Sequence, residues 1–398
     1  MTPTGRVMKH THSAFSLRKK ENETLEDLQK QFFAMTDNID EITSVTTPHA
    51  FIGWTYFYSI FLILSAIVYF MSPIMSIVSI LVAVIPCFVY GITLNKKTPF
   101  LYERYQSRDL ISSIPSIDYD RQEIVLLANI DAPYQKFWVA TVSPAFNLAI
   151  IILSTIGAFY MLILSSISIA TAGPYTLPSG SLMSAGFCAA VFVPAWLAMF
   201  FYYTINYTQQ DMDGNKNSCQ ALLDIYKHFQ QDPLQNTRIT VALCGANEVG
   251  YIGLRAFLDY SKSQELKLPQ LFVCVNKLLD KEKLHVTISK KTQSLSRILN
   301  QIDGLNVKNG YDIYEMVSQQ GAFLTFKQRG AITISATELD KNYQHDAKKT
   351  ENVVTKTCDI IKEIAVDIDD ALTKMKQEKG NAISAIVNEN AQENSQGK

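Results

Sequence analysis

Two long stretches of this 398-residue chain contain no Asp, Glu, Lys or Arg, and they constrain the fold more than any other feature of the sequence. They cover residues 42–95 and 137–210. A helix needs about 20 apolar residues to cross a bilayer, so each stretch is long enough for two crossings. Buried helices of soluble proteins normally carry much shorter charge-free runs. The pattern excludes a purely soluble enzyme, a secreted disulfide scaffold and a disordered chain.

Turn-forming residues interrupt each stretch once. Ser72-Pro73 divides the first into segments near 51–71 and 74–94, and residues 171–182 (TAGPYTLPSGSL) divide the second into segments within 137–170 and near 183–206. The sequence therefore predicts four transmembrane helices in two hairpins, at 46–95 and 137–206. The lipid bilayer is accordingly an expected partner. Small residues in these helices favour close helix packing, and a homo-oligomer formed through them remains an alternative.

The positions of Lys and Arg predict how the helices are oriented. Positive charges are frequent in residues 1–20 and 95–136, whereas the two hairpin turns contain none. Because cytoplasmic loops carry an excess of Lys and Arg, we expect a multi-pass membrane protein whose N-terminus and C-terminal half are cytoplasmic. The formal net charge of −1 gives no basic field that would favour nucleic acid as a partner.

The polar part of the chain alternates between strand-like and helical patterns. Short continuous apolar runs predict buried strands at Ile124–Ala128, Ile239–Leu243 and Leu271–Val275. Helical patterns lie at Cys219–Gln230, Gly253–Ser263, Lys291–Ile302 and Thr350–Lys374. We therefore expect a three-layer α/β sandwich with a mixed, mainly parallel sheet, split between 96–136 and 207–375 by the second hairpin. Residues 1–45 are expected to form a cytoplasmic arm and residues 376–398 a disordered tail.

Each predicted strand is followed within a few residues by an Asn: Asn129, Asn247 and Asn276. In open α/β sheets the ligand crevice lies beyond the carboxyl ends of the strands. An amide side chain can hydrogen-bond there but cannot take up a proton at neutral pH. These residues predict a polar crevice without evident hydrolytic chemistry, although an Asn can also simply begin a turn.

The segment Thr240–Phe257 (TVALCGANEVGYIGLRAF) resembles the signature of the co-catalytic zinc aminopeptidases, the family of bacterial leucyl aminopeptidase and glutamate carboxypeptidase. In that family a strand ends in Gly-x-Glu-Glu-x-Gly and a Gly-x-Arg/Lys-Ala helix start follows. Further segments resemble family motifs in the same order: Val125–Asp131, Asp213–Asp224, Phe272–Asn276, Ser318–Phe323 with Gly330–Ser335, and Tyr343–Asn352. The resemblance implies a zinc-aminopeptidase-like fold over roughly residues 120–135 and 207–375.

The resemblance also implies a role for individual positions, and most of them are substituted. The general-base Glu corresponds to Asn247, and the first-site His and the Asp at the third strand end correspond to Asn129 and Asn276. The bridging Asp falls on Gly214, or on Asn215 after a one-residue shift. Three positions keep the family residue: Asp131, which in the family orients the His, and the ligand residues Glu248 and His345. Asp213 is adjacent to the bridging position and could replace it only if the loop changes register, and Gln319 and Gln320 add to the crevice.

Three functions remain open from these residues. The first is a membrane-anchored, catalytically inactive pseudopeptidase that acts as a binding or scaffold module for a peptide or protein partner. The second is an active zinc-dependent hydrolase with a one-metal site rebuilt from Glu248, His345 and Asp213, because zinc normally needs about three protein ligands. The third is a membrane-span interaction protein with a docking domain. Zinc is accordingly expected at no more than one ion per chain, or not at all.

Overall fold

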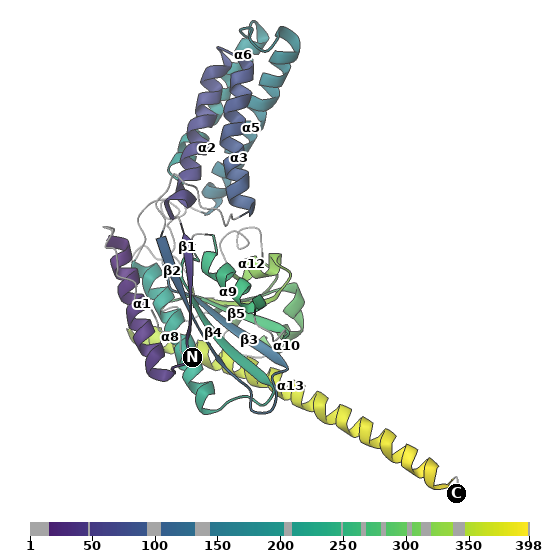
Figure 1. The fold of residues 1–398 in the computed structure, drawn as a ribbon. Helices are drawn as coiled ribbons and strands as arrows, with labels where there is room; N and C mark the ends of the chain where they lie inside the picture. The colour runs from purple at the N-terminus through teal and green to yellow at the C-terminus, as the bar shows by residue number, and fades with distance from the viewer. Residues whose placement is uncertain are drawn as a thin grey trace, which may run out of the picture.

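The computed structural model of the chain describes residues 16–46, 48–93, 105–131, 144–202, 209–247, 250–263, 268–279, 284–300, 305–311, 320–336 and 347–396. These residues form an α/β domain built on one sheet and a bundle of long apolar helices, which stand apart in Figure 1. The α/β domain contains all of the strand ends discussed above.

The sheet has eight strands in the order β1-β2-β4-β3-β5-β8-β6-β7. Their bounds are β1 Asp40–Thr46, β2 Tyr105–Ile114, β3 Gln122–Asn129, β4 Thr237–Cys244, β5 Gln270–Leu278, β6 Leu284–Ile288, β7 Leu305–Asn309 and β8 Gly330–Ala336. The central strands β4, β3, β5 and β8 are mutually parallel, and β6 and β7 are parallel to each other. Antiparallel pairs join β1 to β2, β2 to β4, and β6 to β8. The prediction of a mixed, mainly parallel sheet is confirmed.

Helices cover both faces of the sheet, as expected for strands that are apolar on both sides. Alternate strand residues such as Leu126 and Val241 pack against α1, α8 and α13, and the residues between them, such as Leu127, pack against α9 and α12. The helices are α1 Ser16–Met35, α8 Gln209–Gln231, α9 Ile252–Ser263, α12 Gln320–Phe326 and α13 Ala347–Gln396. The short η2 (Lys290–Leu295) and α10 (Ser296–Leu299) follow β6. The three-layer prediction is therefore confirmed.

Residues 16–46 differ from the expected arm, because they are part of the α/β domain. Leu28 and Phe32 of α1 are fully buried in the core with α8, and the Phe32 ring packs edge-on against Tyr226. β1 pairs along its whole length with β2. Exposed charged residues such as Glu26, Asp27 and Lys30 give this segment its solvated character in the sequence, and among the described side chains of α1 only Leu28 and Phe32 are fully buried. The domain is consequently interrupted twice, once by each hairpin.

The last helix also differs from its prediction. α13 runs from Ala347 to Gln396 and so includes most of the 376–398 segment, for which the sequence predicted disorder. Ala, Glu, Gln and Lys are frequent there and favour helix, even though the segment has too few apolar residues to build a core. In Figure 1 this end of α13 extends away from the sheet. Because the segment extends a helix that is already packed on the domain, its helix propensity decides its conformation despite its polar composition.

The remaining helices form the bundle, with bounds α2 Pro48–Tyr69, α3 Pro73–Thr93, α5 Pro144–Ala172, α6 Ser181–Cys188, the short η1 Ala189–Phe192 and α7 Val193–Phe200. The predicted breaks are confirmed: α2 ends before Ser72-Pro73, and α5 and α6 are separated by residues 173–180. Pro194 lies in the first turn of α7, where its missing N–H costs no helical hydrogen bond.

Two helical segments, rather than four, are long and apolar enough to cross a membrane in the part of the chain with described side chains. They are Ala145–Ala172 and Ser181–Phe200. The corresponding segments of α2 and α3, Gly53–Tyr69 and Pro73–Ile85, are apolar but shorter. The helices themselves are 22 and 21 residues long.

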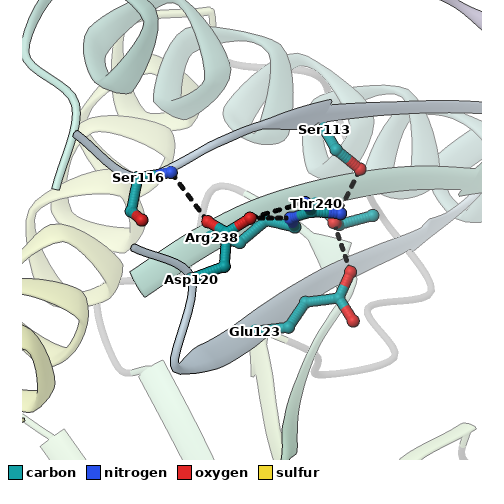
Figure 2. A network of polar contacts seen from close by, with 6 residues as sticks. All are labelled: Ser113, Ser116, Asp120, Glu123, Arg238 and Thr240. Carbon is teal, nitrogen blue, oxygen red and sulfur yellow. Dashed lines mark hydrogen bonds and ion pairs between the residues drawn. The ribbon is translucent and has the colours of Figure 1, made fainter. Parts of the chain in front are cut away.

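A polar network holds the amino ends of the central strands together, at the edge of the sheet opposite the strand ends with Asn. Arg238 of β4 donates from Nε to Asp120 Oδ2 at 2.9 Å, and the backbone N–H of Ser116 donates to Asp120 Oδ1 (Figure 2). Partial burial raises the pKa of Asp120, but these N–H groups and the Arg238 charge outweigh it and hold the pKa below its usual value. Thr240 donates to Glu123 Oε1 at 2.6 Å beside this pair. The network fixes the β2–β3 connection against β4.

Candidate functional site at the strand ends

The carboxyl ends of β3 and β4 lie side by side, because the two strands are parallel and Asn129 is in register with Cys244. The backbone N–H of Ile130 also donates to the Cys244 carbonyl at 2.9 Å, so the two chains continue together for one residue beyond the strands. This arrangement brings Asn129 and the turn after β4 to one place.

Asn247, which occupies the general-base position in the resemblance, uses both ends of its amide in structural hydrogen bonds. Its Nδ2 donates to Oδ1 of Asn129 at 2.8 Å, and its Oδ1 accepts from the backbone N–H of Leu254 at 2.7 Å. Only 2% of Asn247 and 6% of Asn129 is exposed. The amide of Asn247 therefore joins the end of β3 to the first turn of α9.

The turn that carries Asn247 has an unusual backbone. Ala246 has φ 50° and Tyr251 has φ 57°, in the left-handed region that side chains other than Gly rarely adopt. The Tyr251 N–H donates to the Asn247 carbonyl at 2.8 Å and the Ile252 N–H donates to the Ala246 carbonyl at 3.2 Å, which hold the turn closed. Lys277, directly after Asn276, is left-handed as well, with φ 46°. Such strain persists where the surrounding structure fixes the backbone, and it is common at binding sites.

The positions that correspond to the bridging Asp lie within α8 rather than in a loop. A Cβ on Gly214 would come within 3.0 Å of the Lys277 Cα, so α8 packs directly on the chain after Asn276. Asn215 is buried, and its Nδ2 donates to the backbone carbonyl of Asp131. Asp213, two residues before Asn215, is half-buried. The structure therefore brings both Gly214 and Asn215 to the strand ends.

Asn276 and Gln320 contribute further amides on the side of β5 and β8. Asn276 is half-buried and is in register with Ser335 of β8, while Gln320 begins α12 and is 1% exposed. Neither Asn276 Oδ1 nor either polar atom of the Gln320 side chain has a hydrogen-bond partner among the described residues. Both residues were predicted from sequence to line the crevice.

Sequence reasoning missed one acidic residue close to this site. Asp109 of β2 is fully buried, and its Oδ1 accepts from the backbone N–H of Gly245, two residues before Asn247, at 2.8 Å. Burial raises the pKa of Asp109 to about 7, although the Gly245 N–H opposes the shift. A Cβ on Gly253 would lie 2.6 Å from the same carboxylate oxygen, so only Gly fits there. In the sequence, the one indication that Asp109 is buried is its position directly before the apolar pair Leu110 and Ile111.

The cysteines around the site are neutral thiols. Burial raises the pKa of Cys219, Cys244 and Cys274, and the nearby Asp131 raises that of Cys219 further. Cys219 of α8 donates to the Asn129 carbonyl at 3.3 Å, so it holds α8 against β3. A thiol with a raised pKa is a poor metal ligand, because metals bind the thiolate.

The donors at these strand ends do not fit a two-zinc centre. Zinc in proteins is bound by thiolate, imidazole and carboxylate, whereas Asn129, Asn215 and Asn247 present amides already engaged in hydrogen bonds. In the described ranges no three His, Cys, Asp or Glu side chains lie close enough together to hold a metal ion. Glu248, His345 and Gln319 lie outside the described residues, so the predicted site of Glu248, His345 and Asp213 stays a prediction.

No protein-family model matches this chain, and no curated protein is similar to it. Solved structures with a similar fold include BSAP, a zinc aminopeptidase from Bacillus subtilis, with 12% identity, 67% of this chain and 52% of that chain covered, and a TM-score of 0.37. LapB from Legionella pneumophila shares 11% identity over 84% and 62% of the two chains, with a TM-score of 0.39. A glutaminyl cyclase from an Acidobacteriales bacterium shares 10% identity over 91% and 98%, with a TM-score of 0.36. This chain thus spans about half the length of the Bacillus subtilis enzyme.

Proposed function

We propose that this chain is a membrane-anchored protein whose zinc-aminopeptidase-like α/β domain binds a peptide or protein partner without hydrolysing it. The observation that carries the proposal is the pair of hydrogen bonds made by Asn247, to Asn129 and to the Leu254 N–H. These bonds give the position of the general base a structural role that joins β3, β4 and α9.

An amide at this position cannot perform the proton transfer that peptide hydrolysis requires. A carboxamide is neither protonated nor deprotonated near neutral pH, and both of its polar atoms are already used. Losing a general base alone costs about 10²–10⁴-fold in rate. Asn129 and Asn215 in place of metal ligands add to this loss, because hydrolysis in such a site depends on a metal-bound water.

The strand ends carry features that are common at binding sites. Residues with a strained, left-handed backbone lie at two of them, Ala246 just beyond β4 and Lys277 near the end of β5, and buried amides lie at the same edge of the sheet. Backbone strain costs about 1–3 kcal/mol per residue, so its presence favours a function for this shape. A binding or scaffold domain that binds part of a partner accounts for these observations.

Membrane anchoring is the second part of the proposal, and the polarity of the bundle supports it. Its interior contains buried hydroxyl groups, including Ser76 and Ser165, which hydrogen-bond to each other at 3.0 Å between α3 and α5. Its surface carries large apolar side chains, among them Ile60, Ile67, Met75, Ile85, Ile156, Phe159 and Ile163. In water this distribution would be unfavourable, whereas in lipid the apolar surface is matched by the acyl chains. We infer that all four helical segments cross the bilayer, with both ends of the chain cytoplasmic.

Hydrolysis assays test the first part. Full-length protein purified in detergent and supplied with zinc is expected to release no product from aminoacyl-4-nitroanilides above the rate of the Glu248→Ala/His345→Ala double variant. Chelator-sensitive hydrolysis that the double variant lacks would overturn the proposal and establish a rebuilt metal site.

Cysteine labelling in whole cells tests the second part. Ser179 is exposed in the turn between α5 and α6, so Ser179→Cys is expected to react with a membrane-impermeant maleimide from outside. Ser263→Cys, exposed at the end of α9, is expected to react only after lysis. Equal labelling of both positions from outside would contradict the topology.

A further inference from the structure

The Gln320 side chain is buried but makes no hydrogen bond with the described residues. It is 1% exposed, and both Oε1 and Nε2 lack a partner. A buried amide left in this state is costly, because its hydrogen bonds to water have been given up without replacement. Gln270, on the same sheet, shows the ordinary situation: its Nε2 donates to Glu123 at 2.7 Å and its Oε1 accepts from Arg329 at 2.6 Å.

The helix that carries Gln320 cannot easily move to relieve this. α12 packs on β5 and β8 through Phe323 and Leu324. Gly321 lies so close to the sheet that a Cβ there would collide with Thr333 Oγ1 and Tyr311 OH. Those two hydroxyls are themselves hydrogen-bonded at 2.8 Å. The backbone next to Gln320 is therefore fixed against β8.

A second unpartnered amide atom lies at the same end of the same two strands. Asn276 Oδ1 is buried and accepts no hydrogen bond from the described residues. Asn276 is in register with Ser335 of β8, two residues beyond Thr333, against which Gly321 packs. Residues two apart on a strand face the same side of the sheet, so these groups share one face.

We propose that Gln320 and Asn276 form a binding site for an uncharged primary carboxamide, the side chain of an Asn or Gln residue of the bound partner. A carboxamide offers one acceptor and two donor hydrogens, which complement Gln320 Nε2 and Oε1 in a paired arrangement. The neighbouring Asn276 oxygen accepts a further N–H. This site rests on the proposed binding function and gives that function a chemical specificity.

The specificity follows from the cost of an unmatched polar group in a buried site. A carboxylate in place of the carboxamide offers no donor to Gln320 Oε1 or Asn276 Oδ1 and would have to be desolvated as a charge. Sites built to hydrogen-bond one polar group reject the analogue that cannot make the bond. A partner with Gln is therefore expected to be preferred over the same partner with Glu.

Thermal unfolding of two matched variants tests whether the Gln320 amide is reserved for a ligand. Gln320→Met keeps the size of the side chain and removes an unpaired amide, so it is expected to raise Tm by about 2–4 °C. Gln270→Met removes an amide that is fully bonded and is expected to lower Tm by a similar amount. A lower Tm for both variants would show that the Gln320 amide is already satisfied and would overturn the proposal.

Binding of a defined peptide tests the chemical class. Acetyl-Ala-Gln-Ala-N-methylamide and its Glu counterpart, which has no primary carboxamide, are titrated by ligand-observed NMR against wild-type protein and Gln320→Met. The Gln peptide is expected to bind at least about tenfold more tightly than the Glu peptide, and Gln320→Met is expected to remove the difference. Equal affinity of the two peptides, or no binding of either, would contradict the proposal. Peptide hydrolysis by the protein would overturn the proposed function alone and leave both comparisons intact.

Discussion

Asn247 and Asn129 lie 118 positions apart in the sequence and are joined by a 2.8 Å hydrogen bond between their side-chain amides. The bond links the turn after β4 to the end of β3, and the same Asn247 amide accepts from the first turn of α9. The two positions correspond, by the resemblance in the sequence, to a general base and a metal ligand. Under the proposed function, this amide contact replaces the proton acceptor and the metal ligand that a hydrolase would need.

Removing this amide should destabilise the domain. Asn247→Leu would remove the hydrogen bonds that Asn247 makes to the Leu254 N–H and to Asn129 Oδ1 in a buried place, at a cost of about 2–4 kcal/mol in the free energy of unfolding. Asn306→Leu, at an exposed side chain, should change it by less than about 0.5 kcal/mol. Chemical unfolding of both variants measures the difference. Equal stabilities would mean that the Asn247 bonds contribute nothing.

The buried acid Asp109 predicts a dependence of stability on pH. Burial raises the pKa of this carboxyl in the folded protein to about 7, well above its ordinary value. Because the folded state then holds the proton more tightly, the stabilisation is fully present below the unfolded pKa and is lost as pH rises through about 7. Asp109→Asn should remove this component and make the variant more stable than wild type at pH 8. Unfolding curves from pH 4 to pH 8 measure it, and parallel profiles for the two proteins would contradict it.

Asp369 of α13 is expected to be important for docking that helix. Its two carboxylate oxygens accept from the backbone N–H groups of Gln235 and Asn236, at 2.8 and 2.7 Å, just before β4. Asp369→Ala would remove both bonds and should lower the free energy of unfolding by about 2–4 kcal/mol. The exposed neighbour Asp370 provides the control, since Asp370→Ala should be nearly neutral. Limited proteolysis should cut α13 faster in Asp369→Ala alone.

The interior of the bundle should tolerate little added volume. Ser165 is fully buried between α5 and α3, whereas the next residue, Ser166, is exposed on the bundle surface. Ser165→Leu should lower the thermal stability in detergent, because it both overpacks the interior and removes a hydrogen bond. Ser166→Leu should preserve it, since an apolar residue on this surface would face lipid. If Ser166→Leu were the more damaging change, the surface would not be lipid-facing.

Much of the α/β domain could be predicted from sequence because continuous apolar runs identify strands buried on both faces. β3, β4 and β5 extend the predicted runs by only a few residues at each end. β1 and β2 were not foreseen, because an edge pair alternates weakly and carries charges such as Glu41 and Arg108, which form an ion pair at 3.1 Å. The place of α1 depends on Leu28 and Phe32, whose burial comes from tertiary packing rather than local pattern.

The sequence indicated which residues follow the strands but not the hydrogen bonds that they make. The apolar runs placed Asn129, Asn247 and Asn276 at strand ends, and the topology brings the first two together. The hydrogen bonds of Asn247 to Asn129 and Leu254 depend on the geometry of the turn, which the sequence does not show. Asp109 could not be assigned to the site from sequence, because its place beside Gly245 follows only from the antiparallel pairing of β2 with β4.

Zinc stoichiometry of the full-length protein, purified in detergent after zinc loading and measured by elemental analysis, tests the central claim most directly. If amides have replaced a metal centre, the wild type and the Glu248→Ala/His345→Ala variant should both contain close to no zinc. A wild type with about one zinc ion per chain that the double variant loses would show a rebuilt metal site, because zinc needs about three protein ligands. That result would contradict the account of a binding module without hydrolytic chemistry.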